Sequence, residues 1–63
     1  MEYKIRAFRE QLKMSQQELA VRSGVSRATI SGLESGTLTV TTTETLIKIA
    51  NALDRKVSDI FLA

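Results

Sequence analysis

The side chains that most often carry out chemistry in proteins are missing from this sequence. Its 63 residues include no histidine and no cysteine, which removes the commonest metal ligands, the usual general base and the thiol nucleophile. Carboxylates, lysines and hydroxyls remain, on a chain too short to enclose a typical ligand pocket. We therefore expect a protein that is not an enzyme and that needs no metal and no cofactor.

Polar residues suited to binding are concentrated in one stretch instead. Residues 16–33, QQELAVRSGVSRATISGL, place small and apolar positions on both sides of Gly24. Two helices that cross closely need a small residue at the crossing and a glycine free to adopt positive φ in the turn. The second helix would then direct a set of small or polar residues outward: Ser26, Arg27, Ala28, Ser31 and Gly32. We expect function on that face.

Capping residues predict the limits of these two helices. Ser15 and Glu18 have the spacing of a capping box, in which each side chain satisfies a backbone donor of the opening turn, so a helix is expected over residues 16–23. Ser26 is the next cap candidate, ahead of a helix over residues 27–35. Gly36 should end this second helix.

The flanking segments supply the remaining helices. Ile5, Phe8 and Leu12 lie three and four residues apart, which predicts a helix over about residues 3–13, with Met14 closing it against the core. Residues 37–43 are rich in threonine, but no second strand-like run pairs with them, so we interpret them as a loop. Either Thr41 or Thr42 caps the next helix.

The last third of the chain has the same helical periodicity. A fourth helix carries apolar residues at helical spacing, namely Leu46, Ile49, Ala50 and Leu53. Residues 54–56 form a polar connection, and Ser58 is expected to cap a short fifth helix whose Ile60 and Phe61 pack back on the first. The whole chain, residues 1–63, is therefore predicted to be one all-α domain with five helices in a compact unit.

The net charge of the chain says less about a binding partner than the positions of the charged residues do. Nine Lys and Arg against seven Asp and Glu give a net charge of +2 and a pI of about 9.4, a mild basicity that does not by itself identify a partner. No run approaches the roughly 18 apolar residues of a membrane span, and the first residues are amphipathic, unlike a secretory signal. We expect a cytoplasmic protein with no membrane partner.

Two segments of the sequence resemble a known family. SQQELAVRSGVSRATISGLESG, followed by TLIKIANALDRKVSDIF, is similar to the small stand-alone repressors of bacteria and prophages with a Cro/C1-type helix-turn-helix, the XRE family. The resemblance covers about residues 5–61 and includes the two-helix motif, the Glu-x-Gly ending and the LxKIAxAL pattern of the fourth helix. It implies a lambda-repressor-like domain that binds operator DNA through a recognition helix in the major groove.

The resemblance assigns the base-reading role to the outward face of residues 27–35. Ser26, Arg27 and Ala28 would meet base edges first, with Ser31 and Gly32 one turn further along. Arg27 is the best-supported of these, because a guanidinium binds O6 and N7 of guanine in bidentate fashion. Ala28 would touch a thymine methyl. The alternative is that Arg27 and Ser31 form only a solvated helix face.

A second group is expected to contact the DNA backbone. The family places a residue at the position of Gln16 on the backbone, at a helix end that offers free N–H donors to phosphate; the alternative is a plain exposed residue. The full expected set comprises amides and hydroxyls: Gln16, Gln17, Thr29, Ser35, Thr37 and Thr39. Thr29 has a second interpretation, as a support for the helix.

The sequence departs from the family pattern in three places. Gly32 stands where relatives often have a larger polar residue, which suggests either a close backbone approach to DNA or readout of DNA shape. Loop residues 37–43 offer hydroxyls where relatives often have Lys or Arg, which predicts a modest salt dependence of binding. Ser23 occupies a position that is more commonly apolar.

The resemblance also implies a structural pair between Arg9 and Glu34. An arginine near the end of the first helix and the glutamate closing the third would hold the recognition helix against the first helix, and Arg9 could also face a phosphate. The alternative is that Arg9 is solvated and Glu34 is only a helix-end carboxylate.

Two functions from different classes follow. The first is a transcriptional regulator, a repressor that occupies double-stranded DNA as a homodimer, assembled in solution or only on DNA, since one short readout gives little specificity. The second is a protein-interaction module, of antitoxin or anti-repressor type, that uses the same domain against a protein partner. Val57, Phe61 and Leu62 are candidates either for the dimer contact or for the core.

Overall fold

The computed structural model describes residues 2–38 and 40–62. Their elements in chain order are β1 (Glu2–Tyr3), α1 (Ile5–Gln11), α2 (Gln16–Ser23), α3 (Arg27–Ser35), α4 (Thr43–Ala52), α5 (Val57–Ile60) and β2 (Phe61–Leu62). The predicted all-α fold with five helices is confirmed. No helix within the described residues is long and apolar enough to cross a membrane.

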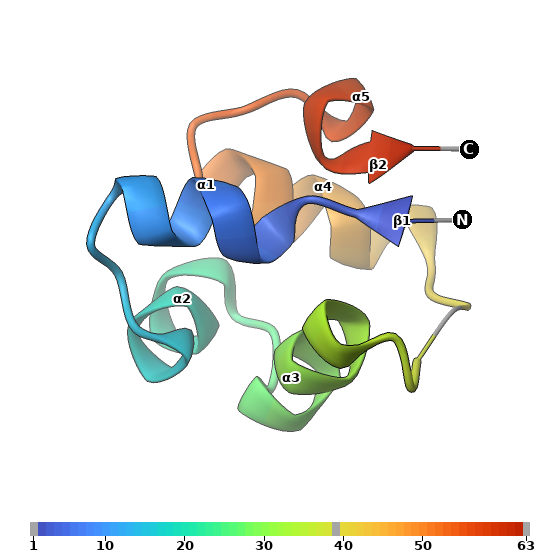
Figure 1. The fold of residues 1–63 in the computed structure, drawn as a ribbon, viewed down its shortest axis with the longest axis horizontal. Helices are drawn as coiled ribbons and strands as arrows, with labels where there is room; N and C mark the ends of the chain where they lie inside the picture. The colour runs from blue at the N-terminus through green and yellow to red at the C-terminus, as the bar shows by residue number, and fades with distance from the viewer. Residues whose placement is uncertain (1, 39, 63) are drawn as a thin grey trace.

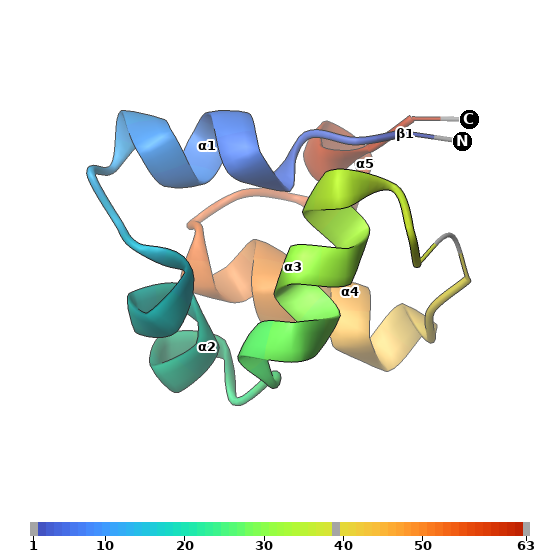
Figure 2. The same cartoon turned by 60° about the horizontal axis from the view of Figure 1, so that its bottom comes forward.

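The helices enclose one small core. In Figure 1, α2 and α3 lie below α1 and α5 lies above it, with α4 behind α1, and Figure 2 shows α4 running behind α3. Every helix contributes a fully buried or nearly fully buried side chain; the largest at the centre are Ile5, Leu19, Ile30, Ile49, Leu53 and Ile60. The core contains apolar residues that the sequence predicts in the second, third and fourth helices. This core packs against the inner side of α3 and so holds its outer face toward solvent.

The turn between α2 and α3 is built as the sequence predicts. Gly24 has φ 74°, a left-handed conformation that a residue without Cβ adopts at no steric cost. Ser23, which replaces a more common apolar residue, is buried, and its Oγ accepts a hydrogen bond from the backbone N of Val25 at 3.2 Å. The hydroxyl therefore satisfies a buried donor of the turn, which explains how a polar residue is accommodated there.

The first helix is shorter than predicted. It begins at Ile5 because the preceding residues join β1, in which Tyr3 pairs with Phe61 and Glu2 with Leu62 in an antiparallel register. It ends at Gln11, and Lys13 takes a left-handed φ of 55°. Leu12, expected on the packed face, is consequently 51% exposed, whereas Met14 is buried as predicted.

The caps of α4 and α5 resolve one alternative and correct one prediction. Thr42, rather than Thr41, is the N-cap of α4, and its Oγ1 accepts from the backbone N of Thr45 at 3.1 Å. Ser58 is not the cap of α5, because it lies inside that helix; Asp59 Oδ2 accepts from the backbone N of Lys56 at 3.0 Å instead. Phe61 belongs to β2, and its predicted side-chain packing on α1 lies outside the described side chains.

Candidate nucleic-acid interface

The outward face of α3 begins at its N-cap. Ser26 Oγ accepts from the backbone N of Thr29 at 3.2 Å, and the two hydroxyl oxygens lie 2.8 Å apart. Ser26 is exposed and Thr29 is half-buried, so both hydroxyls already serve the first turn of the helix. These contacts fit the role of Thr29 as a support for the helix, and its contact with the DNA backbone stays a prediction.

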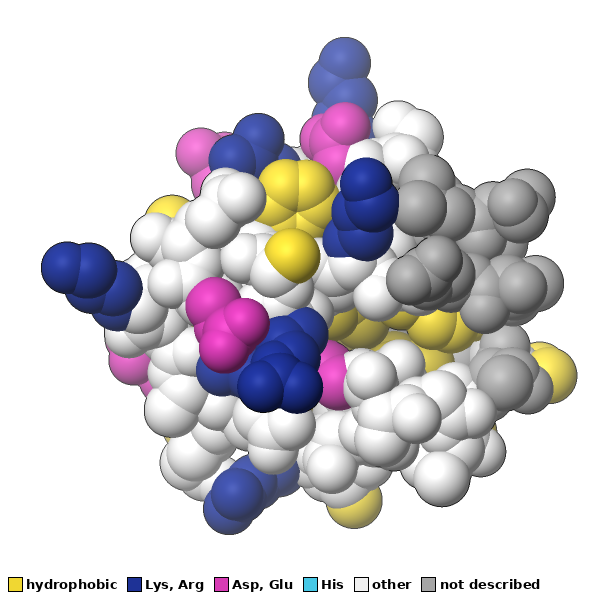
Figure 3. Space-filling view, viewed as in Figure 1, with side chains coloured by type: hydrophobic (Ala, Val, Ile, Leu, Met, Phe, Trp, Pro, Cys, Tyr) yellow, Lys and Arg dark blue, Asp and Glu magenta, His cyan; other side chains and the backbone are white. Residues whose placement is uncertain are grey.

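Arg27 follows this cap at the first position of α3. Its side chain is exposed, and within the described part of the chain its guanidinium has no hydrogen-bond or ion-pair partner. Ala28 and Ser31 are exposed beside it. Figure 3 shows that the surface over α2 and α3 in this view consists mostly of uncharged groups. The structure therefore brings a single free cation together with small side chains at the start of α3.

Gly32 has a packing role that sequence reasoning missed. A Cβ built on this residue would lie 2.9 Å from Cβ of Leu38, closer than real Cβ atoms approach one another. The missing side chain therefore faces Leu38 of the following loop. This close approach within the protein accounts for the absence of a larger side chain at position 32, and the predicted approach of Gly32 to DNA stays a prediction.

At the end of α3, the backbone carbonyl of Gly32 accepts hydrogen bonds from the loop that follows the helix. Gly32 O accepts from the backbone N of Gly36 at 3.1 Å and from that of Leu38 at 3.0 Å. The hydroxyls of Ser35 and Thr37 also donate to it, at 3.3 and 3.4 Å, and lie 2.8 Å from each other. Both expected backbone-contact residues are exposed. Thr39, the remaining member of that predicted set in the loop, lies outside the described residues.

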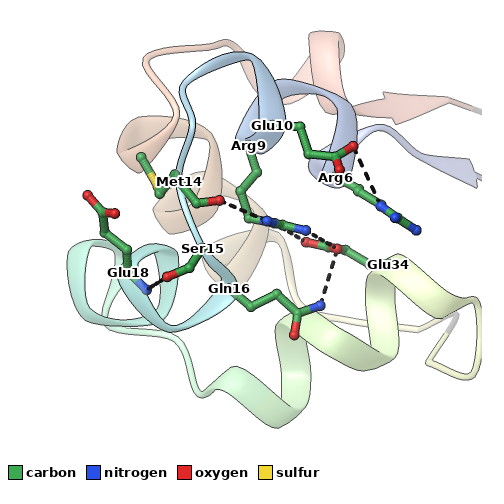
Figure 4. A network of polar contacts seen from close by, with 8 residues as sticks. All are labelled: Arg6, Arg9, Glu10, Met14, Ser15, Gln16, Glu18 and Glu34. Atoms are coloured by element: carbon green, nitrogen blue, oxygen red, sulfur yellow. Dashed lines mark hydrogen bonds and ion pairs between the residues drawn. The ribbon is translucent and has the colours of Figure 1, made fainter.

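Arg9 and Glu34 join α1 to the end of α3, as Figure 4 shows. Glu34 Oε2 accepts from Arg9 Nε at 2.9 Å and Oε1 accepts from Nη2 at 3.0 Å, while Nη1 donates to Met14 O at 2.8 Å. Their side chains are 13% and 5% exposed. The hydrogen bond with Glu34 raises the pKa of Arg9, although burial opposes this rise.

Gln16 also belongs to this network. Its Nε2 donates to Glu34 Oε1 at 3.2 Å, which draws the first residue of α2 toward the last turn of α3. Gln17, the next expected backbone contact, is exposed. The capping box at this helix start is half formed: Ser15 Oγ accepts from the backbone N of Glu18 at 3.0 Å, while the carboxylate of Glu18 bonds Arg22.

Arg6 is a residue of this region that sequence reasoning did not single out. With Arg9, Gln16, Ser31, Glu34 and Ser35 it lines a hollow of about 300 Å³ where α1, the start of α2 and α3 meet. The only signal in the sequence was its place three residues before Arg9, on nearly the same face of α1. The hollow adjoins the outward face of α3 because Ser31 belongs to both.

Comparison with known proteins agrees with this geometry. A family model described as helix-turn-helix matches residues 5–60. An uncharacterized HTH-type transcriptional regulator of Archaeoglobus fulgidus is 40% identical over 62 residues, which make up 98% of this chain and 86% of that protein. Together with the glycine turn between α2 and α3, these matches confirm the resemblance read from the sequence: the chain belongs to the helix-turn-helix family.

Proposed function

We propose that this protein is a transcriptional regulator that binds double-stranded DNA sequence-specifically, and that it represses by occupying an operator. The observation that carries the proposal is the free guanidinium of Arg27 at the exposed start of α3. Family membership and the match to a transcriptional regulator support it. The protein performs no chemistry of its own.

In this proposal the start of α3 enters the major groove. Arg27 binds O6 and N7 of a guanine, a contact that discriminates by about 1 to 3 kcal/mol. Ala28 and Ser31 are small enough to let the helix approach the base edges, with Ala28 available to a thymine methyl. Ser26 and Thr29 act mainly through the helix cap, and Gly32 acts by permitting the packing of Leu38.

The backbone contacts come from the residues around this helix. Gln16, Gln17, Ser35 and Thr37 supply amide and hydroxyl donors to phosphates, and Arg9 holds α1 against α3 through Glu34. A homodimer on two half-sites about 34 Å apart would multiply the short readout of one helix. Such contacts position the protein, whereas Arg27 supplies most of the sequence preference.

Selection of bound sequences from random duplex DNA tests this function. The wild-type protein is expected to enrich a motif with one strongly preferred guanine per half-site. Arg27→Ala should lose that preference while retaining weak binding, because it removes a base contact and leaves the backbone contacts intact. Lys56→Ala is the matched control, since it removes the charge of an exposed lysine in the α4–α5 connection.

Two results would contradict the proposal. If the wild-type protein enriched no sequence and bound no duplex at low salt, DNA binding itself would be wrong, and a protein partner would be the remaining function. If Arg27→Ala enriched the same motif as the wild type, DNA binding would stand and the role of Arg27 would be wrong.

A further inference from the structure

The hollow between α1, α2 and α3 presents mainly hydrogen-bond donors. Glu34 is the one carboxylate among its six lining residues, and both its oxygens are occupied: Oε2 by Arg9 Nε, and Oε1 by Arg9 Nη2 and Gln16 Nε2. The remaining lining groups are two guanidiniums, two hydroxyls and an amide, of which the hydroxyl of Ser35 already donates to Gly32 O. A carboxylate that already accepts three hydrogen bonds, two of them from Arg9, opposes an incoming anion less than a free carboxylate does, so the two arginines make the hollow suit an anion rather than a cation.

The two arginines of the hollow keep N–H groups that are available to a further hydrogen-bond acceptor. A guanidinium has five N–H groups, and the structure uses three of those of Arg9, on Glu34 and Met14. Arg6 is freer still, because its side chain is 69% exposed and its one ion pair, with Glu10, is 3.6 Å long. Exposed pairs of this kind contribute little and are readily exchanged for another anion. Figure 4 shows Arg6 extending from α1 beside the buried Arg9 and Glu34.

The hollow adjoins the face of α3 that is proposed to meet DNA. Arg27, Ser31 and Ser35 follow one another at intervals of four residues, so they form one stripe along α3. At a rise of 1.5 Å per residue the stripe is about 12 Å long. With Arg27 at the base edges, Ser31 and Ser35 lead from it to the hollow, which therefore lies about two helical turns from the bases.

We propose that this hollow seats one phosphate of the DNA backbone and that Arg6 is a phosphate-contact residue. The proposal rests on the DNA-binding function above. Arg6 swings from Glu10 to the phosphate, and the free N–H groups of Arg9 and the hydroxyl of Ser31 complete the seat. Glu34 keeps Arg9 and Gln16 in position. The contact is independent of sequence, unlike that of Arg27.

The salt dependence of DNA affinity tests this role. Each ionic contact that is removed lowers the slope of log K against log[salt] by about 0.9, so Arg6→Gln should make the slope shallower by about 0.9 per protomer bound. Lys48→Gln is the matched control, since Lys48 also lies in an exposed i,i+4 pair, with Glu44 at 3.4 Å, and does not line the hollow. It should leave the slope unchanged.

The outcomes separate this proposal from the function on which it rests. Wild-type binding with an unaltered slope in Arg6→Gln would overturn the phosphate contact and leave DNA binding intact. Absence of any duplex binding by the wild type would overturn both. A second test replaces single phosphates of a selected duplex by neutral methylphosphonates. At one position the replacement should weaken wild-type binding more than it weakens binding by Arg6→Gln, because the variant has already lost one contact to that phosphate. Equal effects on both proteins at every position would overturn the contact.

A free anion has the same chemistry as a backbone phosphate, and a second arm distinguishes them. Inorganic phosphate is titrated into the free protein at constant ionic strength, and the amide NMR shifts of residues in α1 and α3 are followed. A backbone seat predicts no saturable binding below about millimolar concentration, because one phosphate lacks the other DNA contacts. Saturable, tighter binding that Arg6→Gln abolishes would instead make the hollow a free-anion site.

Discussion

At the scale of single residues, the buried ion pair has the largest effect on how α3 is held. Arg9 and Glu34 are 25 residues apart in the chain and are joined by two hydrogen bonds, with side chains 13% and 5% exposed. A charge left alone at such a site loses its partner without regaining water, so breaking the pair costs more than replacing it. Because the pKa of Arg9 is raised, its stabilising contribution is lost only at strongly alkaline pH.

A double-mutant cycle with Arg9→Met and Glu34→Leu makes this testable. Each single change should destabilise the fold by about 3 to 5 kcal/mol, because it strands a buried charge, and the double change should cost less than either alone. The free energy of unfolding is measured by urea denaturation in the presence of an osmolyte, which keeps the single variants folded. Additive effects of the two changes would mean that the residues are not coupled.

The residues of the candidate site and the Arg9–Glu34 pair could be listed from the sequence, but the other partners could not. The position of Arg27 after the cap residue Ser26 was sufficient to predict an exposed cation. The attachment of Gln16 to Glu34, by contrast, depends on how α2 and α3 cross, which no local pattern specifies. Arg6 could not be assigned to the site from the sequence for the same reason, since only the folded chain brings α1 beside Ser31 and Ser35.

At the scale of elements, local signals predicted where the two central helices begin and, approximately, where they end. Side-chain caps at Ser15 and Ser26 and left-handed glycines at Gly24 and Gly36 are encoded within one turn of each helix end. The start of α1 and the end of α5 depend instead on the pairing of β1 with β2. Tyr3 leaves its predicted helix because its backbone pairs with Phe61, 58 positions away, a contact that helical periodicity does not register.

Substitution of Gly32 tests how tightly α3 is joined to the loop that follows it. Alanine would gain about 1 kcal/mol of helix propensity, but its Cβ would meet Leu38 Cβ at 2.9 Å, and overpacking costs about 1 to 3 kcal/mol. We expect Gly32→Ala to leave stability unchanged or lower it by up to about 2 kcal/mol, as measured by thermal unfolding.

A neighbouring substitution serves as the control for that experiment. Ser31→Ala changes an exposed residue of the same helix and should be neutral or slightly stabilising, because alanine is the better helix former. Gly32→Ala combined with Leu38→Gly should relieve the clash, because only glycine removes the Cβ of residue 38. A stabilisation of about 1 kcal/mol by Gly32→Ala alone would show that the loop moves away freely.

At the scale of the whole molecule, pairing of charges limits how strongly the protein attracts DNA. Within the part of the chain that the structure describes, Arg6, Arg9, Arg22 and Lys48 are paired with carboxylates, and the net charge of the sequence is +2. Fewer free cations release fewer counterions from DNA. The slope of log K against log[salt], measured by fluorescence anisotropy on a selected duplex, should therefore be clearly shallower than the value of about −10 known for strongly ionic repressors. A slope that steep would contradict the charge assignment.

The two-residue strands have a consequence for engineering the molecule. Because Glu2 lies opposite Leu62 in the β1–β2 pair, the two ends of the described chain are neighbours, and Figures 1 and 2 show them far from the first turn of α3. A short peptide joining the ends would make a cyclic protein without distorting the helices. Closing a ring of this length should stabilise the fold by about 4 kcal/mol through the entropy of the unfolded chain. A label or second domain attached at either end would likewise leave Arg27 unobstructed.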